Sequence, residues 1–164
     1  MATVLAEPCE LDALIRESYN PPQPVIGWLG QSGFLIRWGA LQLAIDPYLS
    51  DSLAAKYRGT PFPHIRLPPP PIAPDRLTSL HVVLCTHAHT DHMDPETLSL
   101  IAAASPECRF VVPRAEQQTA IARGVPAQRL IAIDAGERVP LAADLSLRAL
   151  PAAHDHYRVQ AVTR

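Results

Sequence analysis

The stretch Thr86-His87-Ala88-His89-Thr90-Asp91-His92-Met93-Asp94 decides how the whole chain is interpreted, because four side chains able to bind a metal lie within six of its residues. Those four side chains are His87, His89, Asp91 and His92. The apolar run Leu80–Cys85 before it is typical of a buried strand. After it, Asp94-Pro95 indicates a helix start, with a side-chain acceptor at the N-cap and proline at the first helical position. The cluster is therefore expected on a loop between a strand and a helix, where folds commonly hold reacting groups.

The spacing of the four side chains favours a metal site over a merely polar surface loop. Residues two apart face the same side of an extended backbone, so His87 and His89 can converge on one ion. Asp91 and His92 follow as the chain turns toward the helix and can address a second ion. Imidazole and carboxylate ligands suit zinc, and also manganese or iron, while the lack of thiolates argues against a closed structural zinc site. Asp94 already has a sufficient structural role as the N-cap, so it is left out of the metal set.

Composition and charge exclude several classes of protein. The chain has 164 residues, of which 48% are hydrophobic and 18% charged, as expected for one globular domain with a real core. Its net charge of -2 does not favour a nucleic acid or an anionic membrane as partner. It has no apolar run long enough to span a membrane and no secretory pattern at its N-terminus, which favours a cytoplasmic location. Cys85 and Cys108 lie in apolar runs and are expected to be small core residues without chemistry.

The remaining pattern indicates an α/β fold with a mixed sheet. Residues 1–24 are expected to form a short helix and a proline-rich lead-in, and residues 25–164 the domain itself. Strands come first, and helices then alternate with strands, which is typical of α/β architecture. The expected elements are a helix over Glu10–Ser18, a hairpin over Val25–Trp38, a strand over Leu41–Ile45, a helix over Pro95–Ala104, a strand over Arg109–Val112, a helix between Pro113 and Gly124, and strands over Leu130–Ile133 and Leu145–Leu150.

Two further residues are candidates for the site. Asp46 ends a buried strand just before Pro47, so it is either a site residue or the start of an Asx-type turn, and the sequence leaves both open. Residues 50–79 are rich in proline and expected to be mostly irregular. A loop of this length is usually functional or mobile, and it is long enough to cover the metal loop. His64 is its one group with obvious chemistry, although a lone loop histidine is more often solvated than catalytic.

The motif His-x-His-x-Asp-His after an apolar strand resembles that of the metallo-β-lactamase superfamily. The similarity extends over about residues 25–156. The stretch Trp28–Phe34, the strand ending in Asp46, and the proline-rich approach to Asp75-Arg76-Leu77 resemble the L-ascorbate-6-phosphate lactonase-like branch. Val125-Pro126 and the Ala135-Gly136-Glu137 turn also fall where that branch would place them.

The resemblance implies a ligand set for two divalent metal ions. His87 and His89 would bind the first metal, and Asp91 and His92 the second. Asp91 would also be the catalytic residue that holds or accepts the proton of the nucleophilic water. His154 follows a predicted strand at the place where the superfamily has its third ligand of the first metal.

The resemblance also implies supporting residues and a reaction. Asp46 would lie beneath the loop and hydrogen-bond the ligands, and His156 is a minor candidate beside His154. The implied reaction is hydrolysis of a small-molecule substrate by metal-bound hydroxide, with a sugar-acid lactone as the first expectation. A phosphodiester is the main alternative substrate, because related members of the superfamily cleave phosphodiesters with the same motif. The metals would be zinc or manganese, or iron.

One part of the superfamily pattern is missing. The superfamily fold is an αβ/βα sandwich of two similar halves, and this chain resembles mostly the first. The aspartate that bridges the two metals and a last histidine come from the second half, and neither Asp155 nor His156 stands in the right context to replace them. The first half alone would expose an apolar sheet face, so we expect either that the chain is a fragment of a longer protein or that a second copy or a complementing chain covers this face. We also expect the chain alone to bind at most one metal tightly and to hydrolyse poorly, and a metal-binding module without turnover is the non-enzymatic alternative.

Overall fold

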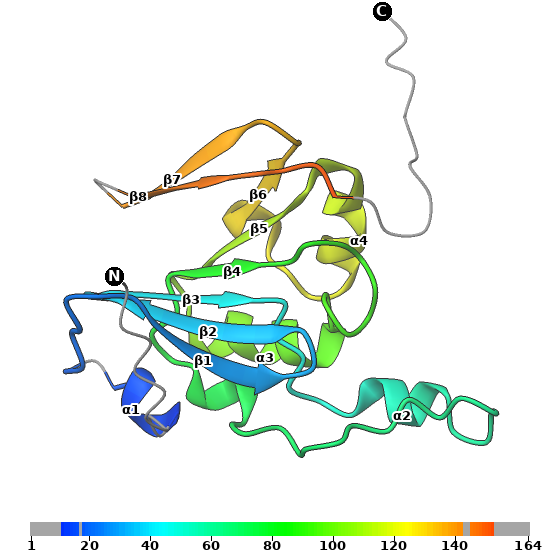
Figure 1. The fold of residues 1–164 in the computed structure, drawn as a ribbon. Coiled ribbons are helices and arrows are strands. Elements are labelled where there is room, and N and C mark those ends of the chain that lie inside the picture. Colours follow the sequence, from blue (N-terminus) through cyan, green and yellow to red (C-terminus); the bar gives the residue numbers. More distant parts are fainter. Residues whose placement is uncertain (1–10, 17, 143–144, 153–164) are drawn as a thin grey trace, which may run out of the picture. The chain divides into compact units, whose positions relative to one another are not determined.

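The structure is a computed structural model that describes residues 11–16, 18–142 and 145–152. The described residues divide into two compact units, with the boundary between Ala132 and Ile133. A six-stranded sheet and the described helices account for the first unit, and a two-stranded hairpin lies in the second (Figure 1). None of the helices in the described ranges has both the length and the apolar character needed to cross a lipid bilayer.

The large sheet is mixed, as the sequence predicts, and its strands follow one another in chain order from β1 to β6. The first three strands form an antiparallel meander, whereas β4 lies parallel to β3 and β5 lies parallel to β4. The strands are β1 (Val25–Gly30), β2 (Gly33–Trp38), β3 (Leu41–Ile45), β4 (Val82–Leu84), β5 (Arg109–Pro113) and β6 (Leu130–Ile133). Ile45 pairs with Leu84, so the chain leaves β3 and β4 at the same edge of the sheet.

Short helices fill the connections between the strands. The α-helices are α1 (Leu11–Leu14), α2 (Ser52–Lys56), α3 (Pro95–Ala104) and α4 (Gln117–Ala122), and the 3₁₀ turns are η1 (Pro74–Arg76), η2 (Arg114–Glu116) and η3 (Ala127–Arg129). The longest, α3, starts as predicted: the Asp94 side chain accepts from the backbone N–H of Thr97 at 2.9 Å, and Pro95 takes the first helical position.

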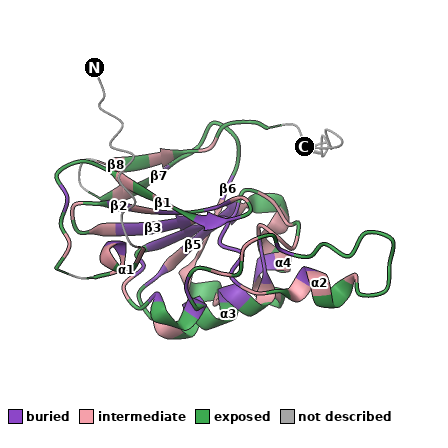
Figure 2. Cartoon of the chain, turned by 60° about the horizontal axis from the view of Figure 1, so that its bottom comes forward, coloured by how far each residue is buried: buried purple, intermediate pink, exposed green. Residues whose placement is uncertain are grey.

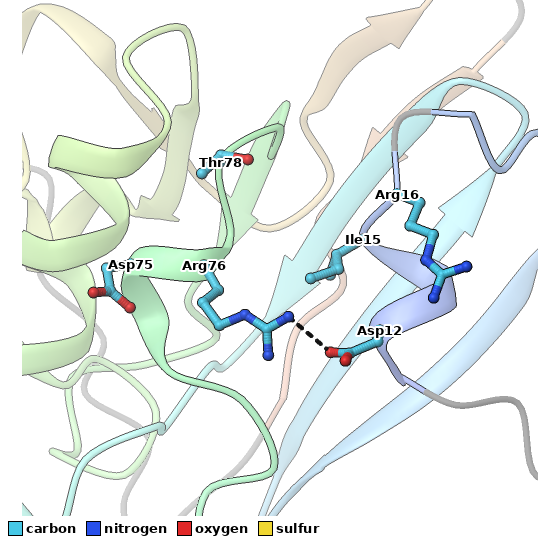
Figure 3. Close-up of a pocket in the computed structure, with 6 residues that line it drawn as sticks. All are labelled: Asp12, Ile15, Arg16, Asp75, Arg76 and Thr78. Atoms are coloured by element: carbon cyan, nitrogen blue, oxygen red, sulfur yellow. Dashed lines mark ion pairs between the residues drawn. The ribbon is translucent and has the colours of Figure 1, made fainter.

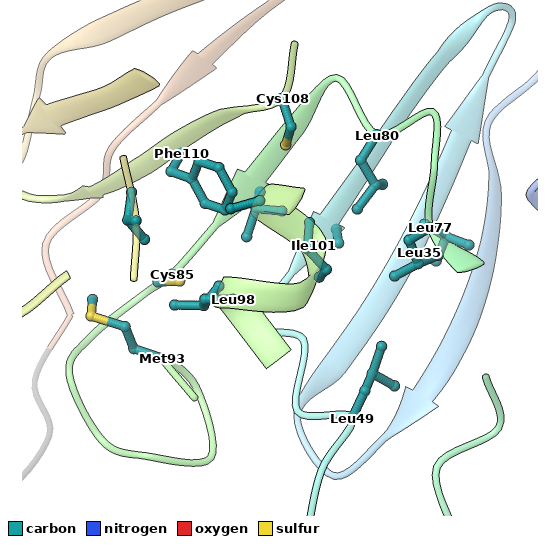
Figure 4. Packing of buried hydrophobic residues seen from close by; sticks show 14 of the residues in the cluster. Leu35, Leu49, Leu77, Leu80, Cys85, Met93, Leu98, Ile101, Cys108 and Phe110 are labelled. Atoms are coloured by element: carbon teal, nitrogen blue, oxygen red, sulfur yellow. The ribbon is translucent and has the colours of Figure 1, made fainter. Parts of the chain in front are cut away.

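The core lies between one face of the sheet and α3 (Figure 4). Alternate strand residues such as Leu35 and Phe110 point into it, and α3 contributes Leu98 and Ile101. All four are fully buried, and burying a side chain of this size stabilises a fold by roughly 1.5–3 kcal/mol. Figure 2 shows the buried residues along the strands and on part of α3. The α3 positions that the sequence predicts as buried, Leu98, Ile101 and Ala102, are confirmed.

The other face of β1 and β2 carries large apolar side chains that are exposed. Ile26 is 62% exposed, Trp28 58%, Trp38 45% and Phe34 39%. Trp28 stands directly opposite Phe34 in the antiparallel register, so these side chains form one continuous group across the two strands. We call Ile26, Trp28, Phe34 and Trp38 the apolar patch.

Two expectations from the sequence need correction: the extent of the N-terminal helix and the start of the helix after Pro113. The N-terminal helix, expected over Glu10–Ser18, ends at Leu14, whose carbonyl accepts a hydrogen bond from the buried Gln42 side chain at 3.1 Å. Residues 50–79 are mostly irregular, as predicted, apart from the helix α2 and the turn η1. The helix expected after Pro113 begins as the 3₁₀ turn η2 and becomes α-helical from Gln117.

The second unit contains the hairpin of β7 (Arg138–Ala142) and β8 (Leu145–Arg148). The predicted strand over Leu145–Leu150 therefore exists but ends two residues earlier, and its partner β7 was not predicted. The two strands pair antiparallel, with Val139 opposite Leu147. The turn before β7 contains Gly136 at φ +93°, and its N–H donates to Ala149 at 2.8 Å.

Candidate metal centre

Residues 86–93, here called the histidine loop, leave the sheet at the end of β4. The last ladder bond before the loop runs from the N–H of Cys85 to the carbonyl of Val111 at 3.0 Å. Near the end of the loop, the N–H groups of His92 and Met93 both donate to the carbonyl of His89, at 3.0 and 2.9 Å. Met93 is fully buried and fixes the loop to the core just before α3 begins. The loop is therefore a compact turn held between a central strand and a capped helix.

The structure brings the four predicted ligand side chains of the loop together. The ring of His87 lies 4.0 Å from that of His92 and 4.7 Å from that of His89, measured between ring centroids. Nε2 of His92 lies 3.7 Å from a carboxylate oxygen of Asp91. Side-chain exposure is 17% for His92 and 36% for Asp91, so the cluster is open to solvent on one side.

Asp46 lies against this cluster with its carboxylate almost fully buried. It follows β3 directly and has a left-handed backbone, with φ 45°, which aspartate tolerates better than most residues. Its Oδ1 accepts from the N–H of Thr86 at 2.7 Å, and its Oδ2 lies 2.8 Å from Nδ1 of His92. Because a carboxylate only accepts, Nδ1 of His92 carries a hydrogen, and in the neutral ring the lone pair is then on Nε2, the nitrogen that faces Asp91.

The hydroxyl of Thr86 connects Asp46 to His87. It lies 2.7 Å from Oδ2 of Asp46 and 3.0 Å from Nδ1 of His87. A hydroxyl has a single hydrogen, which goes to the carboxylate, so the hydroxyl oxygen accepts from Nδ1 of His87. This arrangement leaves the lone pair of His87 on Nε2, which is buried. The sequence analysis did not single out Thr86, although its position between a buried strand and the first histidine was a signal.

The side chains of the cluster are of the types that bind divalent metals, and two of their ligand atoms lie at nearly the spacing expected on one ion. Two ligands of a tetrahedral zinc at about 2.1 Å stand about 3.4 Å apart. Nε2 of His92 and the Asp91 oxygen, 3.7 Å apart, come within a few tenths of an ångström of that spacing. Within the described residues, no three His, Cys, Asp or Glu side chains are yet arranged to hold one ion. Small side-chain rotations, and any ligand from outside the described ranges, would have to complete the site.

Other predicted site residues stand apart from this cluster. His154 and His156 lie outside the described residues. His64 is exposed, with φ 50°, and its ring stacks on Tyr57 at 4.4 Å within the same proline-rich segment. Among the contacts of the described residues, we find none from His64 to the histidine loop.

Arg66 anchors the proline-rich segment to the chain that follows Asp46. Its buried guanidinium donates to the carbonyls of Tyr48 and Leu29, the latter at 3.3 Å, and stacks over the Tyr48 ring at 4.9 Å. Burial lowers the pKa of Arg66. A Cβ added to Gly30 would come within 2.6 Å of this guanidinium, so the glycine allows the close approach. The segment is thus tied to the Asp46 side of the sheet at one buried residue.

A separate pocket lies between α1 and η1 (Figure 3). Its volume is about 490 Å³, and Arg76 forms an ion pair with Asp12 across it at 3.2 Å. Both side chains are about half exposed, and such pairs contribute about 0–1 kcal/mol. The pocket is lined by Asp12, Ile15, Arg16, Asp75, Arg76 and Thr78, none of which belongs to the histidine loop.

The buried cysteines have no part in the cluster. Cys85 and Cys108 are free and buried, as predicted. Burial raises the pKa of both thiols, that of Cys108 to about 12, so neither supplies a thiolate near neutral pH.

Comparison with protein families gives one match that covers most of the chain. The family model described as the beta-lactamase superfamily domain matches residues 42–164. That range includes Asp46, the histidine loop and the second unit.

Curated relatives are similar but themselves lack a described function. Two of them are the uncharacterized protein Rv0906 of Mycobacterium tuberculosis and the uncharacterized protein Mb0930 of Mycobacterium bovis. Each is 26% identical over 129 residues, which is 79% of this chain and 33% of the relative. The chain spans about a third of the length of the curated relatives it matches.

Solved structures show the same fold at low sequence identity. One is Igni18, described as a novel metallo hydrolase from the archaeon Ignicoccus hospitalis, with a TM-score of 0.54 and 19% identity over 82% of this chain and 52% of that one. Another is CmlA, described as a diiron beta-hydroxylase from Streptomyces venezuelae, with a TM-score of 0.52 and 24% identity over 80% of this chain and 24% of that one. At these identities the likeness concerns the fold.

Proposed function

The chain belongs to the beta-lactamase superfamily domain family, and on that premise we propose that its histidine loop is the main part of the metal site of a metal-dependent hydrolase. The observation that carries the proposal is the placement of the buried Asp46 carboxylate against Thr86 and His92, with the rings of His87, His89 and His92 grouped above it. A metal ligand histidine is commonly fixed by such a partner on its second nitrogen. A polar surface loop has no need of one.

We assign the following roles in metal binding and hydrolysis to residues of this chain. His87 and His89 would hold one ion, and Asp91 and His92 a second. Asp91, the most exposed carboxylate of the cluster, would hold or accept the proton of the attacking water. When bound, divalent ions of this kind make water acidic near neutral pH and polarise the bond to be hydrolysed. Zinc and manganese suit this donor set, and iron is the third choice.

For the substrate we propose a small lactone of the sugar-acid type. Support comes from the resemblance of the stretch Trp28–Phe34 and of the strand ending in Asp46 to the lactonase-like branch. Phosphodiesters are the second class to assay, because they are cleaved elsewhere in the superfamily with the same motif. Lactones and phosphodiesters both present one bond to be polarised by a metal, so the same donor set suits either class.

A second candidate function is a metal-binding half-domain that turns over only with a partner. One observation favours it: within the described residues, the donors do not form a set of three on one ion. His154 would supply one more ligand. The aspartate that bridges the metals and the last histidine of the superfamily would come from outside residues 1–164.

Metal binding is tested with matched histidine variants of the whole chain. We expect His87→Ala to weaken zinc and manganese binding by more than about 100-fold, because even the hydrogen-bond partners of ligands change affinity about 10–100-fold. His64→Ala is the control, since His64 is exposed and stacks on Tyr57. Competition with a coloured chelator gives the affinities. Equal losses in the two variants, or no metal binding by the unsubstituted chain, would contradict the proposed site.

Turnover is tested with Asp91→Ala on a panel of lactones and phosphodiesters. If the chain is an enzyme, Asp91→Ala lowers the hydrolysis rate on the class of substrate that the unsubstituted chain cleaves. That class then identifies the reaction. If the unsubstituted chain binds metal but hydrolyses neither class of substrate, the half-domain is favoured. Two metals per chain together with fast hydrolysis would instead show that the chain alone completes the site.

A further inference from the structure

Arg123 reaches the histidine loop from a distant part of the sequence. It is the residue that follows α4, and its Nη1 donates to the carbonyl of Ala88 at 2.6 Å and to that of Met93 at 2.9 Å. Ala88 lies between the first two histidines, and Met93 directly follows the last one. One nitrogen atom therefore holds both sides of the segment that contains His89, Asp91 and His92.

These two bonds close the loop with a charged donor. Hydrogen bonds from a guanidinium are stronger than neutral ones, and both of these are partly buried, where water competes less. The loop's own backbone bonds, from His92 and Met93 to the carbonyl of His89, fix only its second half. Arg123 adds the connection from the beginning of the loop to its end.

The position of Arg123 is itself determined by close packing. Gly124 follows with φ +92°, a conformation that ends α4 and that glycine adopts without strain. A Cβ on Gly124 would come within 3.0 Å of the Ser99 side chain of α3. The next residue, Val125, is buried in the same core as Met93. The guanidinium thus starts from a backbone that is packed against the helix following the loop.

We propose that Arg123 is a positioning residue that preorganises the histidine loop for metal binding. This inference rests on the proposed function of the loop. A loop already held in shape loses less conformational entropy when it binds, and so binds more tightly. The charge of the guanidinium acts in the opposite direction, because a cation near a metal site repels the metal. Loss of Arg123 therefore weakens metal binding if positioning dominates and strengthens it if charge repulsion dominates.

Arg129 offers a matched control within the same unit. Its guanidinium also donates to three backbone carbonyls, those of Ala102, Ser105 and Pro106, at 2.8 to 2.9 Å. These carbonyls belong to the end of α3 and the turn after it, away from the histidine loop. Arg129→Met removes a comparable arginine clamp from the same core without touching the loop.

The test compares Arg123→Met, Arg123→Lys and Arg129→Met in the full chain. We expect Arg123→Met to lower zinc affinity about 10–100-fold, in the range found for residues that support ligands, and Arg129→Met to leave it nearly unchanged. Arg123→Lys keeps the charge and a donor, so it is expected to lose less, and it serves if the methionine variant does not fold. Unchanged or higher affinity in folded Arg123 variants, or an equal loss in Arg129→Met, would overturn the proposal.

A second readout needs no metal. In the metal-free chain, the amide hydrogens of His92 and Met93 should exchange about tenfold faster in Arg123→Met than in the unsubstituted chain, because the loop opens more often. Arg129→Met should leave these two amides unchanged. If the unsubstituted chain binds no metal, the proposed function fails, but this exchange experiment still decides whether Arg123 holds the loop. If the amides of His92 and Met93 exchange at the same rate in all variants, that result alone would show that Arg123 does not hold the loop.

Discussion

At the residue scale, the hydroxyl of Thr86 determines which nitrogen of His87 is available to a metal. Its one hydrogen goes to Asp46, so its oxygen accepts from Nδ1 of His87 and leaves the lone pair on Nε2. Asp46 sets the same orientation for His92 by accepting from its Nδ1. Two histidines that are five residues apart thus present the same ring nitrogen, because one buried carboxylate and one hydroxyl lie beneath them.

This arrangement predicts that Thr86→Val weakens zinc binding about 10–100-fold, whereas Thr86→Ser changes it little. Valine has nearly the shape of threonine, and the Thr86 backbone bond to Asp46 remains in both variants. The nitrogen chemical shifts of the His87 ring, measured by NMR without metal, give a second readout. The valine variant should shift His87 away from the form with hydrogen on Nδ1. If the valine and serine variants behave alike in both measurements, the hydroxyl does not orient His87.

Two aspartates three residues apart make a second pair for comparison. Asp94 is fully buried, and its carboxylate accepts from the N–H and hydroxyl of Thr97 at 2.9 and 2.6 Å and from the hydroxyl of Ser52 at 2.7 Å. Asp91 is partly exposed and faces His92. The first therefore supports the fold, and we assign the second to the metal.

We predict that Asp94→Ala lowers the free energy of unfolding by about 2–4 kcal/mol, because the helix cap is lost and buried donors are left without acceptors. Asp91→Ala should change it by less than about 0.5 kcal/mol, as is usual for partly exposed side chains, while abolishing tight metal binding. Urea unfolding of the metal-free chain measures the first effect, and chelator competition the second. A large stability loss in Asp91→Ala would show that its role is structural.

At the scale of elements, the sequence predicts best those segments whose signals are local. α3 was predicted from Asp94-Pro95 and its apolar face, and the β1–β2 hairpin from the glycines between two apolar runs. α2 was not predicted, because it has only five residues, lies in a segment with prolines on both sides, and is held by contacts with residues distant in sequence. One such contact is the bond from the Ser52 hydroxyl to the Asp94 carboxylate at 2.7 Å, which joins residues 42 positions apart. β7 was not predicted either, because Pro140 within it argues against a strand.

The site follows the same rule. The histidine loop is contiguous in sequence, so its residue types and spacing could be read directly. The residues alone left two alternatives for Asp46, since its contact with Thr86 joins residues 40 positions apart, and only the superfamily resemblance placed it beneath the loop. Arg123 has no local signal at all, because its bonds to Ala88 and Met93 depend on how the chain after α4 packs against α3 at Gly124 and Ser99. Spacing along the chain cannot reveal a contact that only the tertiary fold creates.

At the scale of the whole molecule, the apolar patch on β1 and β2 is the main group of large apolar side chains that the described residues leave exposed. Its four side chains are 39–62% exposed, and they lie on the sheet face opposite to the one packed on α3. The superfamily resemblance predicts that the second half of an αβ/βα sandwich covers the corresponding face. Contiguous apolar surface of this kind is uncommon on soluble monomers and usually marks an interface.

We predict that the chain on its own associates with a second copy through the apolar patch. Light scattering after size-exclusion chromatography should then give at least the mass of a dimer, increasing with concentration. The double variant Ile26→Lys with Trp38→Lys places charges on exposed positions of two strands, so it should shift the chain to a monomer without unfolding it. Leu67→Lys is the control, because Leu67 is 95% exposed and lies on the proline-rich segment outside the patch. A well-folded monomer of the unsubstituted chain at high concentration would contradict self-association, and an equal effect of Leu67→Lys would show that association does not use this face.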